Sequence, residues 1–275
     1  MPAEFSPARW ERAYRAMIGR AFAKVPFYRD QWAEAGRALD EPVPTPSAAL
    51  AGQTHRLCPF ARPFDPSREP SPWIGDGRDL REALALAGTP PRAPVLEVRP
   101  AVLDRRSLGR GGPRYGVLLP PGAKVVDESR RRALNAAALR LARDAGQAIL
   151  VGERAALDAF LPELDGVRVT AVERMTADRA VREKAVQEKG VREKGVRGKT
   201  VAHDPHLGYF AAAGEGCGEL HLLWRRFHAR LRGGVPAVTA LRRTRPVLAG
   251  VIPDGAGGLT LGRCPGHGTP IFVTD

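Results

Sequence analysis

The sequence predicts an α/β protein with a helical N-terminal lead, a small parallel sheet with flanking helices, and a β-rich C-terminal part. Three observations support this class. Apolar residues recur every three or four positions over residues 10–25, which is typical of an amphipathic helix. Strand-like and helix-like segments alternate over residues 91–175, as they do in parallel sheets covered by helices. After residue 200, short apolar runs indicate successive strands.

The helical lead covers residues 1–90. Its first helix begins with a capping Ser6 followed by Pro7, whose fixed φ suits the first helical position. Residues 37–75 are rich in proline and lack periodicity, so they are predicted to wrap the molecule as extended chain. The helices predicted in this part span residues 7–25, 29–35 and 78–87.

The α/β core is predicted over residues 91–175. Asp127 is a favourable N-cap for its longest helix, and Gly146 stands where glycine most often ends a helix. Ligands of parallel sheets bind beyond the carboxyl ends of the strands, so we expect any ligand there. The predicted strands span residues 95–98, 116–119, 148–151 and 167–172, and the predicted helices span 127–145 and 153–161.

A charged low-complexity insertion follows at residues 176–200. It contains a five-residue repeat (VREKA, VQEKG, VREKG, VRGKT), in which one valine in five cannot form a continuous helical stripe. We therefore expect a solvated, mobile tether or a frayed helix. The β-rich part covers residues 201–275, with strands predicted at 219–223, 227–231, 237–241, 247–252 and 258–261.

Four residues of the β-rich part have the spacing of metal ligands. Cys217 and His221 form a Cys-x3-His pair, and Cys264 and His267 form a Cys-x2-His pair. Two thiolates and two imidazoles suit a tetrahedral Zn²⁺ ion. A closed shell of four ligands leaves no position for water or substrate, so the sequence favours structural zinc over catalytic zinc. The alternative is two unrelated buried pairs.

The formal net charge of +13 is concentrated in two stretches. Residues 179–199 hold eight Lys or Arg against three Glu, and residues 220–253 hold seven Arg and no acid. Such a field attracts phosphates, acidic proteins or anionic cofactors. Only Trp224 and Phe227 lie among these cations, so base stacking, and with it nucleic-acid binding, has little support.

Other features of the sequence bear on the compartment. With only three cysteines, two of them in the metal motif, no disulfide framework is expected and a reducing interior is indicated. The N-terminus lacks a signal peptide pattern, and no apolar run approaches the roughly 20 residues needed to cross a bilayer. We therefore predict a cytoplasmic protein without a membrane segment.

Several short phrases occur together in one enzyme family, in this order. They are Val25-Pro26-Phe27-Tyr28-Arg29, Cys217-Gly218-Glu219-Leu220-His221, Thr239-Ala240-Leu241, Arg245-Pro246-Val247-Leu248 and Cys264-Pro265-Gly266-His267-Gly268. Through them the chain resembles the phenylacetate-CoA ligase-like branch of the adenylate-forming enzymes. The resemblance implies a single adenylation-like domain over residues 1–275, with structural zinc at the Cys/His motif. It also implies that residues 145–172 line an acyl pocket.

The chain departs from this family where nucleotide chemistry is expected. Its counterpart of the phosphate-binding loop retains Ser107, Gly109 and Gly112, but Arg110 stands where the family has a threonine and one residue is missing. A plain glycine-rich surface turn is the alternative. The family's Mg²⁺-binding Glu motif is matched only by residues 209–215, with the wrong spacing, and no acid follows the Arg-Pro-x-Leu phrase. The chain also ends at Asp275 without the small C-terminal domain and its lysine. These departures leave ATP or AMP doubtful as cofactors.

The remaining reactive side chains favour structural roles. His203, Asp204 and His206 suggest either a second metal or acid–base site or, as we prefer, a solvated turn. His228 is expected at the surface. Cys58 lacks the basic surroundings that activate a thiol, so we expect it to be a buried structural residue.

Three functions are compatible with the sequence. The first is a degenerate acyl-activating homologue that acts as an accessory protein, holding an acyl or aryl substrate or docking an acidic acyl carrier protein. The second is a minimal ATP-dependent acyl or aryl acid ligase that needs a partner ligase subunit. The third is a basic zinc module that binds nucleic acid. The arginines expected to attract an acidic carrier are Arg225, Arg226, Arg230, Arg232, Arg242, Arg243 and Arg245.

Overall fold

The structure, a computed structural model, describes residues 4–36, 42–63, 77–102, 114–125, 127–188 and 199–274. Its α-helices are α1 (Pro7–Lys24), α2 (Pro26–Glu34), α3 (Gly77–Leu86), α4 (Glu128–Ala145), α5 (Arg154–Phe160) and α6 (Ala177–Glu188). Short 3-10 helices are η1 (Ser47–Leu50) and η3 (Leu161–Leu164). Within these residues, every helix is too short or too polar to cross a bilayer.

The strands form one large sheet, a four-stranded sheet and a short pair. They are β1 (Thr45–Pro46), β2 (Val95–Val98), β3 (Ala101–Val102), β4 (Tyr115–Leu118), β5 (Lys124–Val125), β6 (Gln147–Gly152), β7 (Arg168–Met175), β8 (Lys199–Asp204), β9 (Gly208–Ala213), β10 (Leu220–Leu222), β11 (Phe227–Arg232), β12 (Val235–Ala240), β13 (Val251–Ile252), β14 (Leu259–Arg263) and β15 (Pro270–Thr274).

The large sheet confirms the predicted fold class. Its order is β14-β15-β10-β9-β8-β7-β6-β2-β4. Strands β4, β2, β6, β7 and β8 are parallel neighbours, and the sheet continues antiparallel through β9, β10, β15 and β14. Strand β8 is therefore parallel to one neighbour and antiparallel to the other. The predicted core and the predicted β-rich part share one continuous sheet.

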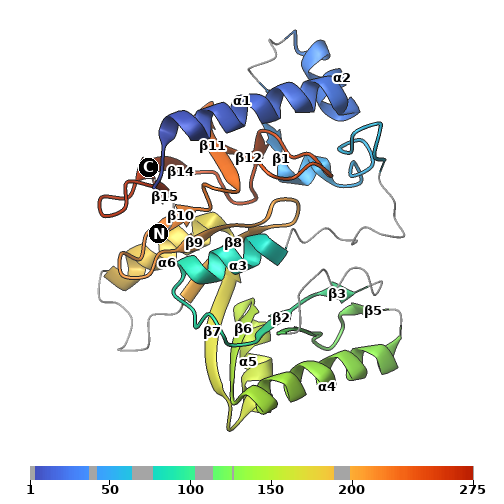
Figure 1. Ribbon diagram of the computed structural model, residues 1–275, viewed down its shortest axis with the longest axis vertical. Helices are drawn as coiled ribbons and strands as arrows, with labels where there is room; N and C mark the ends of the chain where they lie inside the picture. Colours follow the sequence, from blue (N-terminus) through green and yellow to red (C-terminus); the bar gives the residue numbers. More distant parts are fainter. Residues whose placement is uncertain are drawn as a thin grey trace.

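Helices cover both faces of the parallel half (Figure 1). Leu96 and Leu150 point to one face, where they pack with Ala138 of α4 and Leu157 of α5. Ile149 and Val151 alternate to the opposite face and join the main core, which includes α3. Because both faces are buried, these strands read as nearly continuous apolar runs, as parallel strands usually do.

A second sheet, β1-β13-β12-β11, carries the N-terminal helix. On α1, the residues Tyr14, Met17, Ile18 and Ala21 are buried, which matches the predicted amphipathic pattern. Trp10 donates its indole N–H to the carbonyl of Phe227 at 2.8 Å and so fixes α1 to β11. The N-terminal helix thus packs against the C-terminal part of the chain, more than 200 positions away in sequence.

The structure corrects the strand assignments of the C-terminal part. Strands β8, β9 and β15 were not among the predicted ones, and the predicted strand at 247–252 is regular only at β13. Strand β9 reads Gly-Tyr-Phe-Ala-Ala-Ala and is almost wholly buried, so it lacks the alternation that identifies a half-exposed strand. Helix α6 takes in the first eight residues of the repeat-bearing stretch from 181, and residues 189–198 lie outside the described residues.

A buried carboxylate joins α3 to the C-terminal part. Asp79 pairs with Arg226 and also with Arg243, whose Nη2 lies 2.6 Å from Asp79 Oδ2. All three side chains are at most 8% exposed. The expectation that Arg226 and Arg243 present their charge to an acidic partner is therefore wrong, because both guanidinium groups are committed inside the molecule. Arg230 likewise pairs with Glu11 of α1.

The expectation of a surface position for His228 is also wrong. Its side chain is 2% exposed and lies between Trp10 and Tyr14, with ring centroids at 4.0 and 4.2 Å. The local sequence could not show this, because the covering rings belong to α1. Burial, with a smaller contribution from Arg230, lowers the pKa of His228 from 6.5 to about 4, although Glu11 at 3.4 Å acts in the opposite direction.

This histidine makes the docking of α1 sensitive to acid. Because its pKa is lower in the folded chain, the unfolded chain binds the proton first, and stability is lost as pH falls from 6.5 towards 4. Between about pH 7.5 and about pH 5.5 the loss from this residue is about 1 kcal/mol. His228→Phe should reduce the pH dependence of the unfolding free energy by that amount in urea titrations. His55 is exposed, so His55→Phe serves as the control. Equal pH dependence of the unfolding free energy in the wild type and both variants would show that His228 is not the acid-sensitive group.

Candidate metal centre and neighbouring pocket

Two turns of matching geometry bring the predicted metal ligands together. In the first, Gly214 N–H donates to the Glu219 carbonyl at 2.8 Å, and Gly218 N–H donates to the Gly214 carbonyl at 2.9 Å. In the second turn, the same two bonds join residues 264 and 269 at 2.9 Å and residues 268 and 264 at 2.8 Å. Strands β10 and β15, which adjoin these turns, are neighbours in the large sheet. Turns 50 positions apart in sequence are thereby adjacent in space.

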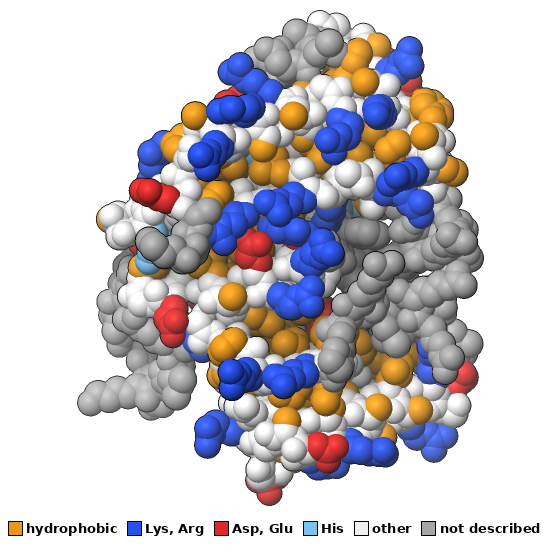
Figure 2. Space-filling view, in the orientation of Figure 1, with side chains coloured by type: hydrophobic (Ala, Val, Ile, Leu, Met, Phe, Trp, Pro, Cys, Tyr) orange, Lys and Arg blue, Asp and Glu red, His pale blue; other side chains and the backbone are white. Residues whose placement is uncertain are grey.

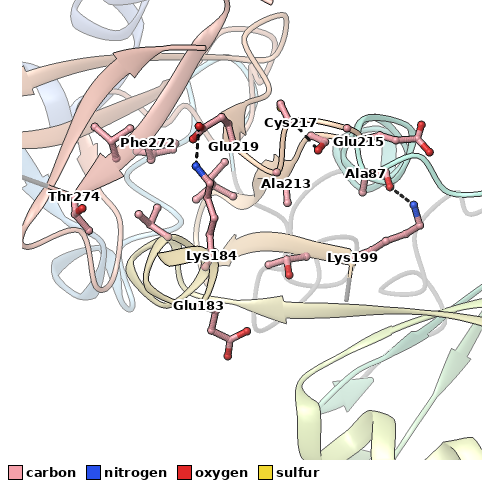
Figure 3. Close-up of a pocket in the computed structure, with 18 residues that line it drawn as sticks. Ala87, Glu183, Lys184, Lys199, Ala213, Glu215, Cys217, Glu219, Phe272 and Thr274 are labelled. Carbon is pink, nitrogen blue, oxygen red and sulfur yellow. Dashed lines mark hydrogen bonds and ion pairs between the residues drawn. The ribbon is translucent and has the colours of Figure 1, made fainter. Parts of the chain in front are cut away.

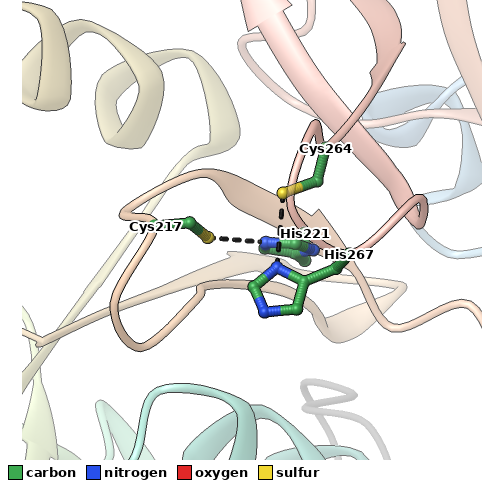
Figure 4. Close-up of side chains that lie close together, drawn as sticks. All are labelled: Cys217, His221, Cys264 and His267. Atoms are coloured by element: carbon green, nitrogen blue, oxygen red, sulfur yellow. Dashed lines mark hydrogen bonds between the residues drawn. The ribbon is translucent and has the colours of Figure 1, made fainter.

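The four side chains converge on one point (Figure 4). One donor atom from each of Cys217, His221, Cys264 and His267 lies within 4.8 Å of all the others. Cys217 Sγ is 3.0 Å from His221 Nε2, and Cys264 Sγ is 3.3 Å from His267 Nδ1. Donors around a tetrahedral Zn²⁺ are about 3.3–3.8 Å apart, given metal–ligand distances of about 2.0–2.3 Å. The cluster thus fits zinc after small movements of its side chains.

The surroundings of the cluster hold the donors in place. His221 Nδ1 lies 2.8 Å from the hydroxyl of Thr269, which leaves Nε2 directed at the sulfur of Cys217. Such a partner on the second ring nitrogen is usual for a histidine that binds metal. A Cβ at Gly214 would lie 2.7 Å from the His221 ring and 2.9 Å from Cys217 Sγ. Glycine is therefore required there for the two ligands to meet.

The electrostatics of the cluster suit a bound cation. Burial lowers the pKa of His221 to about 4, with a further contribution from His267, so the imidazole is neutral at ordinary pH. Burial raises the pKa of the Cys217 thiol, and the neighbouring Cys264 adds to the rise. A divalent ion removes this penalty because it stabilises the thiolate directly.

The first turn is fixed to the end of α3. Glu215 N–H donates to the carbonyl of Leu86 at 3.1 Å, and Lys199 Nζ donates to the carbonyls of Ala87 and Gly88 at 2.5 and 2.8 Å. Gly88 has a φ of +65°, and a Cβ there would lie 2.1 Å from the Glu215 carboxylate. The same helix thus contacts the first turn at its C-terminal end and carries Asp79 near its N-terminal end.

A pocket of about 370 Å³ lies beside the first turn (Figure 3). Val181 of α6, Leu220 of β10 and Phe272 of β15 form its apolar wall. Lys184 enters it from α6 and pairs with Glu219 at 2.7 Å. The pocket adjoins the start of β8, so it is not at the carboxyl ends of the parallel strands, where the sequence led us to expect a ligand.

The residues of the proposed phosphate loop, Ser107, Gly109, Arg110 and Gly112, lie outside the described residues. The solvated turn expected around Asp204 is wrong, because this carboxylate is fully buried. It accepts hydrogen bonds from Ser47 Oγ at 2.8 Å and from the backbone N–H groups of residues 206, 207 and 254. Cys58 is buried as expected, and burial raises the pKa of its thiol.

The large sheet also carries a buried ion-pair network that the sequence did not predict. Glu97 of β2 is paired with Arg99 at 3.0 Å and accepts hydrogen bonds from Tyr115 and, at 2.7 Å, from Tyr209. Burial alone raises the pKa of Glu97, but Arg99, the two phenols and Arg174 together lower it. The only sequence signal was a single acid inside the apolar run Val-Leu-Glu-Val, and its partners come from distant strands.

Comparison with known proteins identifies the fold. No family model and no curated protein sequence matches the chain. Among solved structures, 2-hydroxyisobutyryl-CoA ligase in the postadenylation state with 2-HIB-AMP superposes with a TM-score of 0.54 at 15% identity, over 98% of this chain and 67% of that chain. An open conformation of that ligase with 2-HIB-AMP and CoA superposes with a TM-score of 0.53 at 16% identity. This match covers 98% of this chain and 69% of that chain. The chain therefore has a fold like that of 2-hydroxyisobutyryl-CoA ligase over most of its length.

Proposed function

We propose that this protein is a degenerate relative of acyl-activating enzymes that serves as an accessory protein. In this role it holds an acyl or aryl ligand, or docks an acidic carrier protein, without a complete adenylation machinery. The likeness to CoA ligases over 98% of the chain carries the proposal. The altered loop at Ser107, Gly109, Arg110 and Gly112, and the absence of an acid directly after the phrase at 245–248, argue against an intact nucleotide site. We further propose that the protein derives from the phenylacetate-CoA ligase-like branch of the adenylate-forming enzymes.

The pocket beside the first turn is the proposed ligand site. Its volume of about 370 Å³ is in the range of small-molecule sites. The apolar wall suits a short acyl chain or an aryl ring, and Lys184 and Lys199 supply cationic groups to a ligand carboxylate. Both lysines have internal partners, so ligand binding would require an exchange of contacts rather than simple addition.

The Cys/His cluster is the proposed zinc site of this protein. Cys217, His221, Cys264 and His267 would fill the coordination shell, so the ion would cross-link the two turns and take no part in catalysis. Residues 1–275 would then form one domain, with the ion joining the ends of β10 and β15.

Thermal-shift measurements with aromatic and short aliphatic acids, ATP and AMP test the ligand role. We expect an acid to raise the melting temperature by about 2–4 °C at saturation, with little effect of either nucleotide. Ala213→Leu, which adds bulk to the pocket lining, should abolish the shift. Ala137→Leu on the exposed side of α4 is the matched control. A shift that Ala213→Leu leaves intact, or no shift with any acid, would reject this site.

The second candidate is a minimal ATP-dependent acyl or aryl acid ligase completed by a partner subunit. It is favoured by the two similar structures described above, both of 2-hydroxyisobutyryl-CoA ligase with 2-HIB-AMP bound. Pyrophosphate release from ATP and one of the acids above would support this candidate over the accessory role. None of the comparisons favours nucleic-acid binding.

A further inference from the structure

The outward face of α1 carries a row of cationic side chains with small residues between them. Arg9, Arg12, Arg20 and Lys24 are exposed, and so are the small residues that lie between them, Ala16, Gly19 and Ala23. With 3.6 residues per turn, Arg9, Arg12, Ala16, Gly19 and Ala23 fall along one side of the helix, opposite its buried side chains. Figure 2 shows Lys and Arg side chains spread over the part of the surface where α1 runs in Figure 1.

These cations are not neutralised by the described part of the chain. Arg15 is paired with Glu11 at 3.1 Å, and Glu11 also binds Arg230. Across the residues that the structure describes, no carboxylate pairs with the side chains of Arg9, Arg12, Arg20 or Lys24. By contrast, the buried arginines of the molecule are matched to acids, as Arg226 and Arg243 are to Asp79. Among the described residues, the side chains of Arg9, Arg12, Arg20 and Lys24 thus have no carboxylate partner.

No packing contact within the described part of the chain explains the glycine at position 19. A Cβ at this position would meet nothing within 4 Å, and its φ is not positive. In the interior of an exposed helix, glycine is less stable than alanine because it loses more backbone freedom. Folding alone would therefore favour alanine here. A partner surface that packs closely against the α1 backbone would instead favour glycine, which has no side chain. Ala16 and Ala23 extend this strip of small residues along the helix.

We propose that this face of α1, Arg9, Arg12, Ala16, Gly19 and Ala23 with Arg20 at its edge, docks an acidic α-helix of a partner protein. Helices pack closely where small residues form the contact, and carboxylates spaced along the partner would meet the flanking cations. Arg9 and Arg20 are separated by about 16 Å along the axis, at 1.5 Å per residue, which matches acids about three turns apart. This inference rests on the accessory role proposed above and assigns a surface to its protein partner.

Other occupants fit this face less well. Insertion into a membrane surface needs large apolar side chains on the exposed face, and the large hydrophobics exposed among the described residues are Phe60, Leu161 and Leu231, none of them on α1. Single-stranded nucleic acid needs aromatic platforms, whereas Trp10 and Tyr14 face β11. A second copy of a chain with net charge +13 would repel this face.

The test is fluorescence anisotropy with a labelled helical peptide of about 20 residues, built from Ala and Lys with Glu at every third or fourth position on one side. A peptide of the same composition, with its Glu residues spread around the helix, is the comparison. We expect the one-sided peptide to bind at least about tenfold more tightly, and Arg12→Glu with Arg20→Glu to weaken it at least about tenfold. Gly19→Leu should weaken it about fivefold or more by steric exclusion, with the charge unchanged.

Arg132→Glu with Arg140→Glu on α4 is the matched control, because α4 has the same length of 18 residues and both arginines are exposed. This variant should change affinity by less than about twofold. Equal losses in the two charge variants, equal binding of both peptides, or unchanged binding by Gly19→Leu would overturn the proposal. Tighter binding to a single-stranded DNA or to phosphatidylserine vesicles would also overturn it, in favour of those partners. The thermal-shift assay of the pocket does not involve α1. Failure of the peptide to bind would therefore reject the docking surface without affecting the test of the acyl-ligand site.

Discussion

Asp79→Ala should destabilise the protein by about 3–5 kcal/mol, the usual result of removing one partner from a buried ion pair. The carboxylate is 1% exposed and pairs with both Arg226 and Arg243. Without it, two buried guanidinium groups lose the carboxylate that they share. Arg243 would retain its bonds to the carbonyls of residues 206 and 207, but these carry only partial charge.

Urea denaturation of Asp79→Ala, Asp79→Asn and the wild type measures this effect. Asp79→Asn keeps the shape and some hydrogen bonds, so it should fold and lose less stability than the alanine variant. Asp30→Ala is the control, since Asp30 pairs with Arg56 at 3.1 Å on the surface and should cost no more than about 1 kcal/mol. Similar losses for Asp30→Ala and Asp79→Ala would show that the buried pairs are not important for stability.

Cys264→Ser should abolish zinc binding and lower the melting temperature by about 10 °C. The thiol of Cys264 is buried and has no substitute in the cluster, and a serine hydroxyl is a poor zinc ligand. Metal analysis of the purified wild type should give about one zinc per chain, and the variant should give almost none. Exposure to a chelator should lower the wild-type melting temperature towards that of the variant.

Cys58→Ser provides the matched control for the loss of a buried thiol. Cys58 donates to the carbonyl of Thr54 and is not one of the clustered donors, so its variant should keep the zinc. Hydrogen exchange should then locate the change in Cys264→Ser at the two turns and the C-terminal end of α3, because Glu215 is bonded to Leu86. Full zinc content in Cys264→Ser would reject the four-ligand site.

The sequence predicted the local elements well where their pattern is local. The amphipathic α1 and the apolar strand β2 were both recognised, because burial on a helix face or in a parallel sheet leaves a periodic or continuous apolar signature. The convergence of Cys217, His221, Cys264 and His267 was also anticipated, from ligand spacing alone. In contrast, β9 was not predicted, and β7 was predicted to end at residue 172 instead of Met175. The extent of these strands is set by pairing with neighbouring strands on both sides, which the local sequence does not show.

Contacts between distant segments were not predictable from the sequence. His228 looked like one more polar residue on a basic strand, and only the rings of α1 make it an interior residue. Arg226 and Arg243 looked like surface charge until Asp79 of α3 was placed between them. Thr269 and Gly214, which orient and accommodate the ligands, carried no signal beyond their proximity to the Cys/His motif.

The shared sheet also limits how this protein can be divided. Strand β8 pairs with β7 through four residue pairs, so a fragment starting at residue 199 would expose an unpaired strand edge to solvent. Open edges of this kind recruit other chains, and such a fragment should aggregate rather than fold. A chain cleaved between β7 and β8 would behave differently: its two pieces should copurify and separate only in denaturant, because each supplies the edge that the other lacks.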